Sequence, residues 1–180
     1  MQTRAGHVWD RAQANAPDAL SILLGGNDNQ GLESCLPADC ACFLSAGGWN
    51  TKIHMVAADA RTAVVFALSP GNVHDAPEGR SLLEELGPMP EGLPMQMDKA
   101  YEGNETRQLV LDLGMIPVVP PKSNRLDPWE YDRELYKKRN EVERLFRRLK
   151  GFRRISSRFE KLDVIFLAFI TFVLIVEALR

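Results

Sequence analysis

The sequence is poor in cysteine and has no hydrophobic run long enough to cross a membrane. Its three cysteines, Cys35, Cys40 and Cys42, lie in one short stretch. An odd number so close together argues against a disulfide framework, and no second cysteine or histidine cluster completes a zinc site, so we expect free thiols. The longest uncharged apolar run, residues 164–176, falls short of the ~20 residues that a membrane helix needs. We expect a buried terminal helix there, with a membrane or oligomer contact as the alternative.

A signal peptide and a basic overall composition are also missing. The N-terminus has no apolar stretch behind a basic start, so we expect a cytoplasmic protein. The chain has 22 lysines and arginines against 24 acidic residues, a formal net charge of −2. The positive charge is instead concentrated in residues 122–161, which hold 14 basic and 7 acidic residues. A basic third on an acidic body is typical of proteins that bind a polyanion, although a solvated helix face explains the charge equally well.

Regular patterns begin only at Trp49. Residues 1–46 are interrupted by glycine, proline and asparagine and show no sustained period, so we expect little order there. Beyond them the patterns predict two strands, a helix, a strand, a helix, a strand, a long basic helix and a terminal helix, in the ranges 51–60, 62–71, 75–87, 93–101, 104–114, 116–122, 127–152 and 162–179. Asp75 and Asn104 are the predicted helix caps, and Gly87 and Gly114 the predicted stops. Strands that alternate with helices after an initial hairpin indicate an α/β fold with a mixed sheet.

Four polar residues share one face of the predicted basic helix. At 100° per residue, Tyr136, Arg139, Glu143 and Lys150 fall within a sector about 60° wide. Apolar side chains fill the adjacent sector, so Glu143 is expected at the border between core and solvent. A helix with an ordinary Arg139–Glu143 ion pair is one interpretation of this pattern.

The spacing Tyr136-x2-Arg139-x3-Glu143-x6-Lys150 resembles the Y-R-E-K signature of DDE transposases from bacterial insertion sequences. Other stretches resemble the same family in the same order: GGWNTKIHMVAADA, ALSPGNVHDA, MDKAYEGNETR, GMIPVVPPK and RFEKLDVIFLAFI. The resemblance covers residues 47–180 as a partial catalytic domain and leaves residues 1–46 as a non-matching segment. It implies an RNase H-like fold, a mixed sheet flanked by helices, with the first strand lacking or replaced.

The resemblance also implies the site residues. Asp98 matches the second catalytic aspartate of the family and Glu143 its glutamate, and both are expected to bind Mg²⁺ or Mn²⁺. Carboxylate oxygens suit these hard cations, which activate the attacking oxygen and stabilise the leaving oxygen. Tyr136, Arg139 and Lys150 are expected to contact DNA phosphates beside the metal. The implied partner is double-stranded DNA at transposon ends, together with a second copy or a full-length transposase, near the bacterial nucleoid and without membrane contact.

The third carboxylate that this chemistry needs is not found. The family carries it in a D-S-T-like first strand, and residues 1–46 contain no such motif. Asp39 is a weak substitute, and Asp28 is expected in a loop. The abrupt change at Gly47 indicates a truncated or frame-shifted copy. Two functions therefore stay open: a transposase that cleaves and joins DNA, or a catalytically inactive DNA-binding relic. A structural helical protein fits the motifs less well.

Three further residues have competing interpretations. His74 and Asp75 belong to a stretch that resembles the family; Asp75 is expected to cap a helix, with a role near the active site as the alternative. Trp129 is expected to cover the core rather than to stack on a base. His54 is expected to be a strand histidine with its hydrogen bonds made inside the protein.

Overall fold

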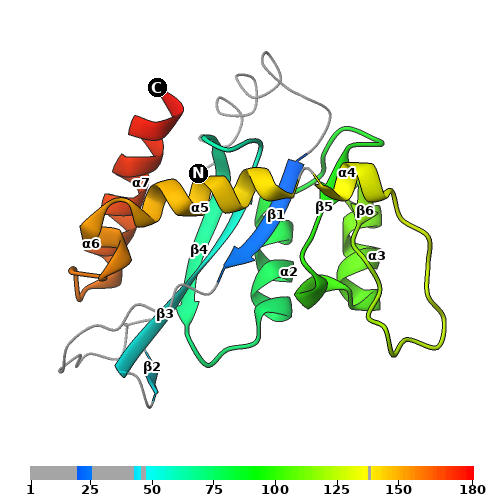
Figure 1. The fold of residues 1–180 in the computed structure, drawn as a ribbon, viewed down its shortest axis with the longest axis horizontal. Helices are drawn as coiled ribbons and strands as arrows, with labels where there is room; N and C mark the ends of the chain where they lie inside the picture. The colour runs from blue at the N-terminus through cyan, green and yellow to red at the C-terminus, as the bar shows by residue number, and fades with distance from the viewer. Residues whose placement is uncertain (1–19, 26–42, 46–47, 138) are drawn as a thin grey trace.

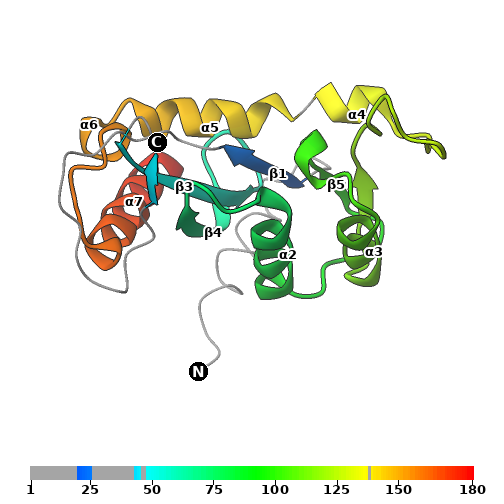
Figure 2. The same cartoon turned by 90° about the horizontal axis from the view of Figure 1, so that it is seen from below.

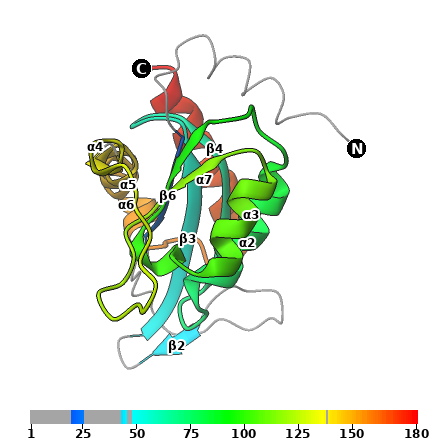
Figure 3. The ribbon, with the colours of Figure 1, turned by 90° about the vertical axis from the view of Figure 1, so that its right-hand side faces the viewer.

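A mixed sheet lies between two layers of helices (Figures 1 and 3). The computed structural model describes residues 20–25, 43–45, 48–137 and 139–180. The strands are β1 (Leu20–Gly25), β2 (Phe43–Ser45), β3 (Gly48–Ala57), β4 (Ala63–Pro70), β5 (Pro94–Gln96) and β6 (Ile116–Val118). The helices are α2 (Asp75–Leu86), α3 (Asn104–Asp112), α4 (Arg133–Lys137), α5 (Asn140–Lys150), α6 (Arg153–Ser156) and α7 (Asp163–Ala178), with a 3₁₀ turn, η1 (Lys99–Tyr101). The predicted α/β class with a mixed sheet is confirmed.

Strand β1 lies at the centre of the sheet. The strand order is β2-β3-β1-β5-β6, and β4 also pairs with β3. β1 runs antiparallel to β3 and parallel to β5. The predicted hairpin is β3 and β4, whose turn is held by Asp59 Oδ1, which accepts hydrogen bonds from Arg61 N at 2.7 Å and Thr62 N at 2.8 Å. The sequence patterns did not predict the strands at 20–25 and 43–45.

The alternation of side chains along β3 builds a core on each face of the sheet. Ile53, Met55 and Ala57 pack with α5, α6 and α7, whereas Val56 packs with α2, α3 and the strands β5 and β6. Figure 2 shows α5 on one side of the sheet and α2 with α3 on the other. Helix α5 also contacts β1, which it crosses in Figure 1. The basic helix is thereby fixed over the middle of the sheet.

Both predicted helix caps are wrong, because the side chains of Asp75 and Asn104 interact with distant basic residues instead of the helix backbone. Helix α2 has His74 at its N-cap position and no side-chain cap; Asp75 binds Lys52 Nζ at 2.8 Å instead. Helix α3 follows Gly103, and the Asn104 side chain accepts a hydrogen bond from Arg125. The predicted stops are confirmed, since Gly87 and Gly114 have φ values of 74° and 85°.

The basic region is not the single long helix that the sequence predicts for residues 127–152. It contains α4 and α5, and α4 begins only at Arg133. Asp132 caps α4, because its Oδ1 accepts from Glu134 N at 2.8 Å and Leu135 N at 3.0 Å. Trp129 is unavailable to a helix because it packs on the α2–α3 core, and its Nε1 donates to Val119 O at 2.8 Å.

The apolar C-terminal segment forms α7, which packs on the sheet as predicted. Phe166 and Ile170 are fully buried in the core shared with α5, whereas Phe172 and Ile175 on the other face are exposed. Among the helices of the described part of the chain, none is both long and apolar enough to cross a membrane.

Candidate functional site

Asp98 stands where β5 ends and η1 begins. Its backbone is extended, and its Oδ1 accepts from Lys99 N at 2.6 Å, which caps the turn. The residues before it, Met95, Gln96 and Met97, are fully buried, so the strand holds Asp98 in a fixed place. The carboxylate itself is 37% exposed, and its Oδ2 is directed away from the capping bond. Asp98 therefore offers one oxygen to solvent or to a ligand.

Helix α5 brings Glu143 to the same place. Val142, Leu145, Phe146 and Leu149 bury one face of the helix, which leaves Glu143 at the border, with its side chain 39% exposed. Arg139, one turn earlier, contacts Glu143 Oε1 through Nη2 at 2.7 Å and Asp98 Oδ2 through Nη1 at 3.8 Å. One guanidinium thus joins two carboxylates that are 45 residues apart in the sequence. We call these three residues, Asp98, Arg139 and Glu143, the carboxylate site.

Tyr136 belongs to the edge of the carboxylate site. The Arg139 guanidinium carbon lies 5.6 Å from the centre of its ring, and the Tyr131 ring meets it edge-on at 5.7 Å. Burial raises the pKa of Tyr136; the charge of Arg139 opposes this, and Asp98, Tyr131 and Glu143 add to it. The Tyr136 hydroxyl therefore stays protonated at neutral pH and can donate a hydrogen bond.

Lys150 does not touch the carboxylate site. It is exposed on α5, two turns beyond Glu143, and in residues 51–137 and 139–180 no partner of its ammonium group is found. The structure thus brings together four of the five predicted site residues and leaves the fifth farther along the same helix face.

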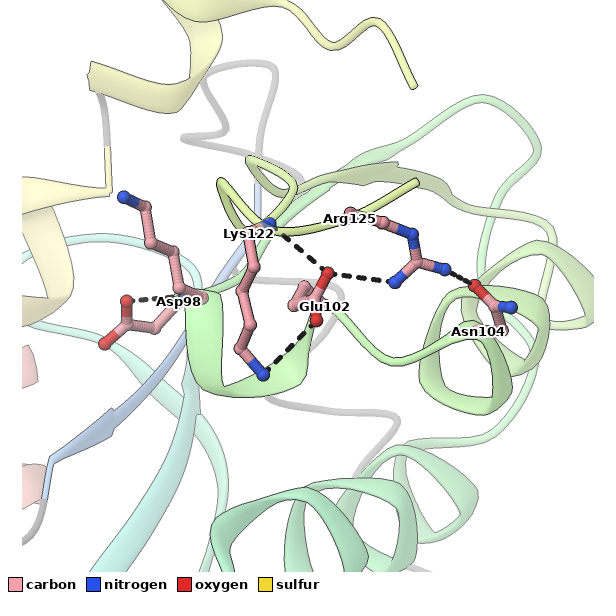
Figure 4. A network of polar contacts seen from close by, with 6 residues as sticks. Asp98, Glu102, Asn104, Lys122 and Arg125 are labelled. Atoms are coloured by element: carbon pink, nitrogen blue, oxygen red, sulfur yellow. Dashed lines mark hydrogen bonds and ion pairs between the residues drawn. The ribbon is translucent and has the colours of Figure 1, made fainter. Parts of the chain in front are cut away.

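A second group of charges, which the sequence did not predict, lies on the other side of Asp98 (Figure 4). Glu102 follows η1, and its side chain is only 9% exposed. It accepts from Arg125 at 3.0 Å and pairs with Lys122 Nζ at 3.2 Å. Burial raises the pKa of Glu102, but hydrogen bonds from Lys122 and Arg125 lower it below its ordinary value. Glu102 thereby fastens the segment after β6 to the turn that carries Asp98. Its spacing in the sequence gave no sign of this burial.

The same segment holds Trp129 between cations. The guanidinium carbons of Arg107 and Arg125 lie 3.7 Å and 4.4 Å from the centre of the Trp129 ring. The ring also packs on the core beneath α2 and α3. The interpretation of Trp129 as a core residue is therefore confirmed.

His54 is a buried residue of β3, but the prediction that its hydrogen bonds are made inside the protein is only half met. Its Nε2 lies 2.6 Å from Ser69 Oγ on β4, whereas its Nδ1 has no hydrogen-bond partner among the described residues. Burial lowers the pKa of His54 to about 4, although nearby Asp75 acts in the opposite direction. The histidine is therefore neutral at physiological pH.

The strand beside Asp98 has no acidic residue. β1 reads Leu-Ser-Ile-Leu-Leu-Gly, and its parallel register pairs Leu20 with Met95 and Ser21 with Gln96. If the register between β1 and β5 is continued by two residues, Leu23 is the residue paired with Asp98. The two weaker candidates for a third carboxylate, Asp28 and Asp39, lie outside the described residues.

The carboxylate site has the donors for one hard cation. Asp98 and Glu143 offer oxygens directed at a common positive group, which is the chemistry that Mg²⁺ or Mn²⁺ requires. A cluster of three or more histidine, cysteine or acidic residues does not occur in the part of the chain that the structure describes. Within the described residues, the carboxylates that converge are therefore Asp98 and Glu143.

Comparison with known proteins identifies the family. A family model described as "Transposase DDE domain" matches residues 48–176. The chain belongs to this family. The match runs from the first residue of β3 into α7 and includes Asp98, Arg139 and Glu143. The family of DDE transposases generally uses a divalent metal ion.

Two individual proteins resemble this transposase domain. A protein of Brucella ovis, whose name assigns it to the transposase of insertion sequence element IS6501, is 29% identical over 122 residues, which are 67% of this chain and 92% of that protein. The second is the piggyBac transposase, in a structure of its synaptic complex with hairpin DNA. It is 14% identical with a TM-score of 0.44, and the match covers 62% of this chain and 24% of that one.

Proposed function

We infer that the chain is a DDE transposase domain that binds duplex DNA across the carboxylate site and retains only part of the cleavage machinery. The observation that carries this proposal is the contact of Arg139 with both Asp98 and Glu143. Family membership supplies the reaction class, the movement of an insertion sequence by DNA cleavage and strand transfer.

The sheet supports an RNase H-like assignment for the fold. The order β4-β3-β1-β5-β6 has three antiparallel strands followed by two parallel ones, with helices on both faces. In that fold the first strand lies at the centre and carries the first carboxylate. Here β1 takes the central place with a purely neutral sequence, in keeping with a replaced first strand.

Each residue of the site has a proposed role. Asp98 and Glu143 would hold one Mg²⁺ or Mn²⁺, which supplies charge stabilisation for an attacking or leaving oxygen. Arg139 would turn from the carboxylates to a phosphate, where its planar group can donate two parallel hydrogen bonds. The Tyr136 hydroxyl would donate a hydrogen bond to the same DNA backbone. Lys150 would act as a point charge beside a phosphate farther along that backbone.

No third carboxylate joins Asp98 and Glu143 in the part of the chain that the structure describes, which favours loss of cleavage. Two carboxylates carry a charge of −2, too little to hold two divalent cations at the ~3.5–4 Å that two-metal chemistry uses. A catalytically inactive, DNA-binding transposase domain is therefore the function that the geometry supports best, and an active transposase is the second candidate, favoured by the family match.

A cleavage assay separates the two candidates. The chain and its Glu143→Gln variant are incubated with DNA that carries the ends of the insertion sequence, with Mg²⁺ or with Mn²⁺. We expect both proteins to bind the DNA and neither to cut it. Robust cleavage that disappears in Glu143→Gln would instead show an active transposase, and Asp39→Asn and Asp28→Asn would then locate the third ligand.

A further inference from the structure

The basic residues of α5 that have an acidic partner and those that have none lie on different faces of the helix. At about 100° per residue, Arg147 and Lys150 fall on the face that carries Arg139 and Glu143, in a sector about 80° wide. Both side chains are exposed, and neither has an acidic partner in the described part of the chain. Arg153, which begins α6 at the end of α5, is likewise exposed and without an acidic partner there.

The other described cations of α5 and α6 pair with acids. Arg144 pairs with Glu141 at 2.5 Å and Arg148 with the buried Glu177 at 3.6 Å, and both lie outside the sector that holds Arg139, Glu143, Arg147 and Lys150. In α6, Arg154 pairs with Glu160 at 3.0 Å. In α4, before the carboxylate site, Lys137 pairs with Glu134 at 2.7 Å. Among the described residues of α5 and α6, the exposed cations without an acidic partner therefore follow the face that runs from Glu143 toward α6.

We propose that a DNA strand leaves the carboxylate site along Arg147 and Lys150 and ends against Arg153, a surface that we call the phosphate track. This proposal rests on the proposed function, because the carboxylate site is taken as the point where the DNA backbone is held. The ligand is duplex DNA, recognised through its phosphates without base contacts. The partner surface on the protein is one face of α5 and the start of α6.

The spacing of the track suits a nucleic-acid backbone. With a rise of 1.5 Å per residue, Arg147 lies about 6 Å and Lys150 about 10.5 Å beyond Glu143 along the helix axis. Phosphates of one strand follow at about 3.4 Å along the axis of the duplex, so the two side chains can reach separate phosphates of one strand. Arginine and lysine both serve as phosphate contacts, the first by a fork of donors and the second by charge.

The track predicts which charges matter for binding. Affinity for a labelled duplex of mixed sequence is measured over a range of salt concentrations for the full chain and two double variants. Arg147→Ala/Lys150→Ala removes two track cations, and Arg144→Ala/Arg154→Ala removes two paired cations of the same region. The matched pair changes the net charge equally. We expect the first variant to reduce the slope of log affinity against log salt by about 1.8, since each phosphate contact contributes about 0.9. The second should keep the slope of the unsubstituted chain, and Arg153→Ala alone should reduce it by about 0.9.

Other outcomes overturn the track or the function separately. An equal loss of slope in both double variants would show a general effect of charge and overturn the track. An unchanged slope in Arg147→Ala/Lys150→Ala, with normal binding by the unsubstituted chain, would overturn the track and the proposed role of Lys150. It would leave DNA binding and the proposed roles of Asp98, Arg139 and Glu143 standing. Failure of the unsubstituted chain to bind any duplex at low salt would overturn both. All substituted side chains are at the surface, and thermal unfolding of each variant checks that the fold is kept.

Discussion

Arg139 is the residue on which the carboxylate site depends. In the structure its guanidinium occupies the space between Asp98 and Glu143, where a divalent cation would also be held. Two positive groups cannot share that space without strong repulsion. Cation binding and the release of Arg139 toward a phosphate should therefore be coupled.

This coupling gives Arg139→Ala two effects of opposite sign. Without the guanidinium, Asp98 and Glu143 lose a competitor, so the affinity for Mn²⁺ should rise. The affinity for duplex DNA should fall, and the salt slope should flatten by about 0.9, because one phosphate contact is lost. Electron paramagnetic resonance of free Mn²⁺ measures the first effect, and a salt titration of DNA binding the second.

The control for Arg139→Ala is Arg144→Ala on the same helix. Arg144 pairs with Glu141 and lies away from Asp98, so its loss should leave the affinity for Mn²⁺ unchanged. A fall in Mn²⁺ affinity in Arg139→Ala would contradict the competition, since it would show that the arginine supports the metal ligands rather than replaces the metal.

His54 predicts a pH dependence of stability. Its pKa is about 4 in the folded protein, and about 6.5 in an unfolded chain. As the pH falls, His54 is therefore protonated first in the unfolded chain. Its contribution to the free energy of unfolding is complete above pH about 6.5 and declines as the pH falls toward 4. Between these values the free energy of unfolding should fall by up to about 1.4 kcal/mol per pH unit from this group.

Urea unfolding at several pH values tests the contribution of His54. In His54→Gln, whose amide can still bond to Ser69, the pH dependence between 4 and 6.5 should become shallower. The exposed His74→Gln makes the same substitution at the surface and is the matched control. An identical pH dependence in His54→Gln and the unsubstituted chain would show that His54 titrates alike in both states.

At the scale of elements, α7 illustrates how an apolar helix is divided between core and surface. Ile170 is fully buried in the core shared with α5, whereas Ile175 is 55% exposed five residues later. The ion pair between the half-buried Arg148 and the buried Glu177 adds a link from α5 to α7. Helix α7 should therefore be an integral part of the domain.

Two identical substitutions in α7 test this docking. Ile170→Ala should lower the free energy of unfolding by about 2–5 kcal/mol, because it removes methyl groups from a packed core. Ile175→Ala should change it by less than about 0.5 kcal/mol, as expected for a surface position. The measurement is urea unfolding of both variants, and equal effects would mean that α7 does not pack as the structure shows.

Sequence patterns predicted the elements from residue 49 onward far better than those before it. Period-two alternation in β3, the β-branched apolar run of β4 and the glycines after α2 and α3 are local signals, and they held. The caps failed because Lys52 and Arg125, distant in the sequence, compete for Asp75 and Asn104. Strand β1 escaped prediction because Leu-Ser-Ile-Leu-Leu-Gly is short and has no alternation, and only its pairing with β3 and β5 defines it.

For the whole molecule, the convergence of Asp98 and Glu143 could be predicted from a family resemblance but not from physical patterns alone. Each carboxylate sits on a different element, and their approach depends on how α5 crosses β1 (Figure 1). Tertiary contacts create three further features that no local sequence pattern predicts. These are the contact of Arg139 with two carboxylates, the burial of Glu102 and the position of the neutral strand β1 beside Asp98. Among the described residues, they leave the site with two carboxylates and one bridging arginine.

The proposed function depends most on one cation that Asp98 and Glu143 would hold together. Mn²⁺ titrations of the chain and of Asp98→Asn, Glu143→Gln and Glu141→Gln test this directly. We expect one bound Mn²⁺, an affinity at least about tenfold weaker in each of the first two variants because a ligand is lost, and an unchanged affinity in Glu141→Gln. Unchanged Mn²⁺ binding in either Asp98→Asn or Glu143→Gln, or an equal loss in Glu141→Gln, would contradict it.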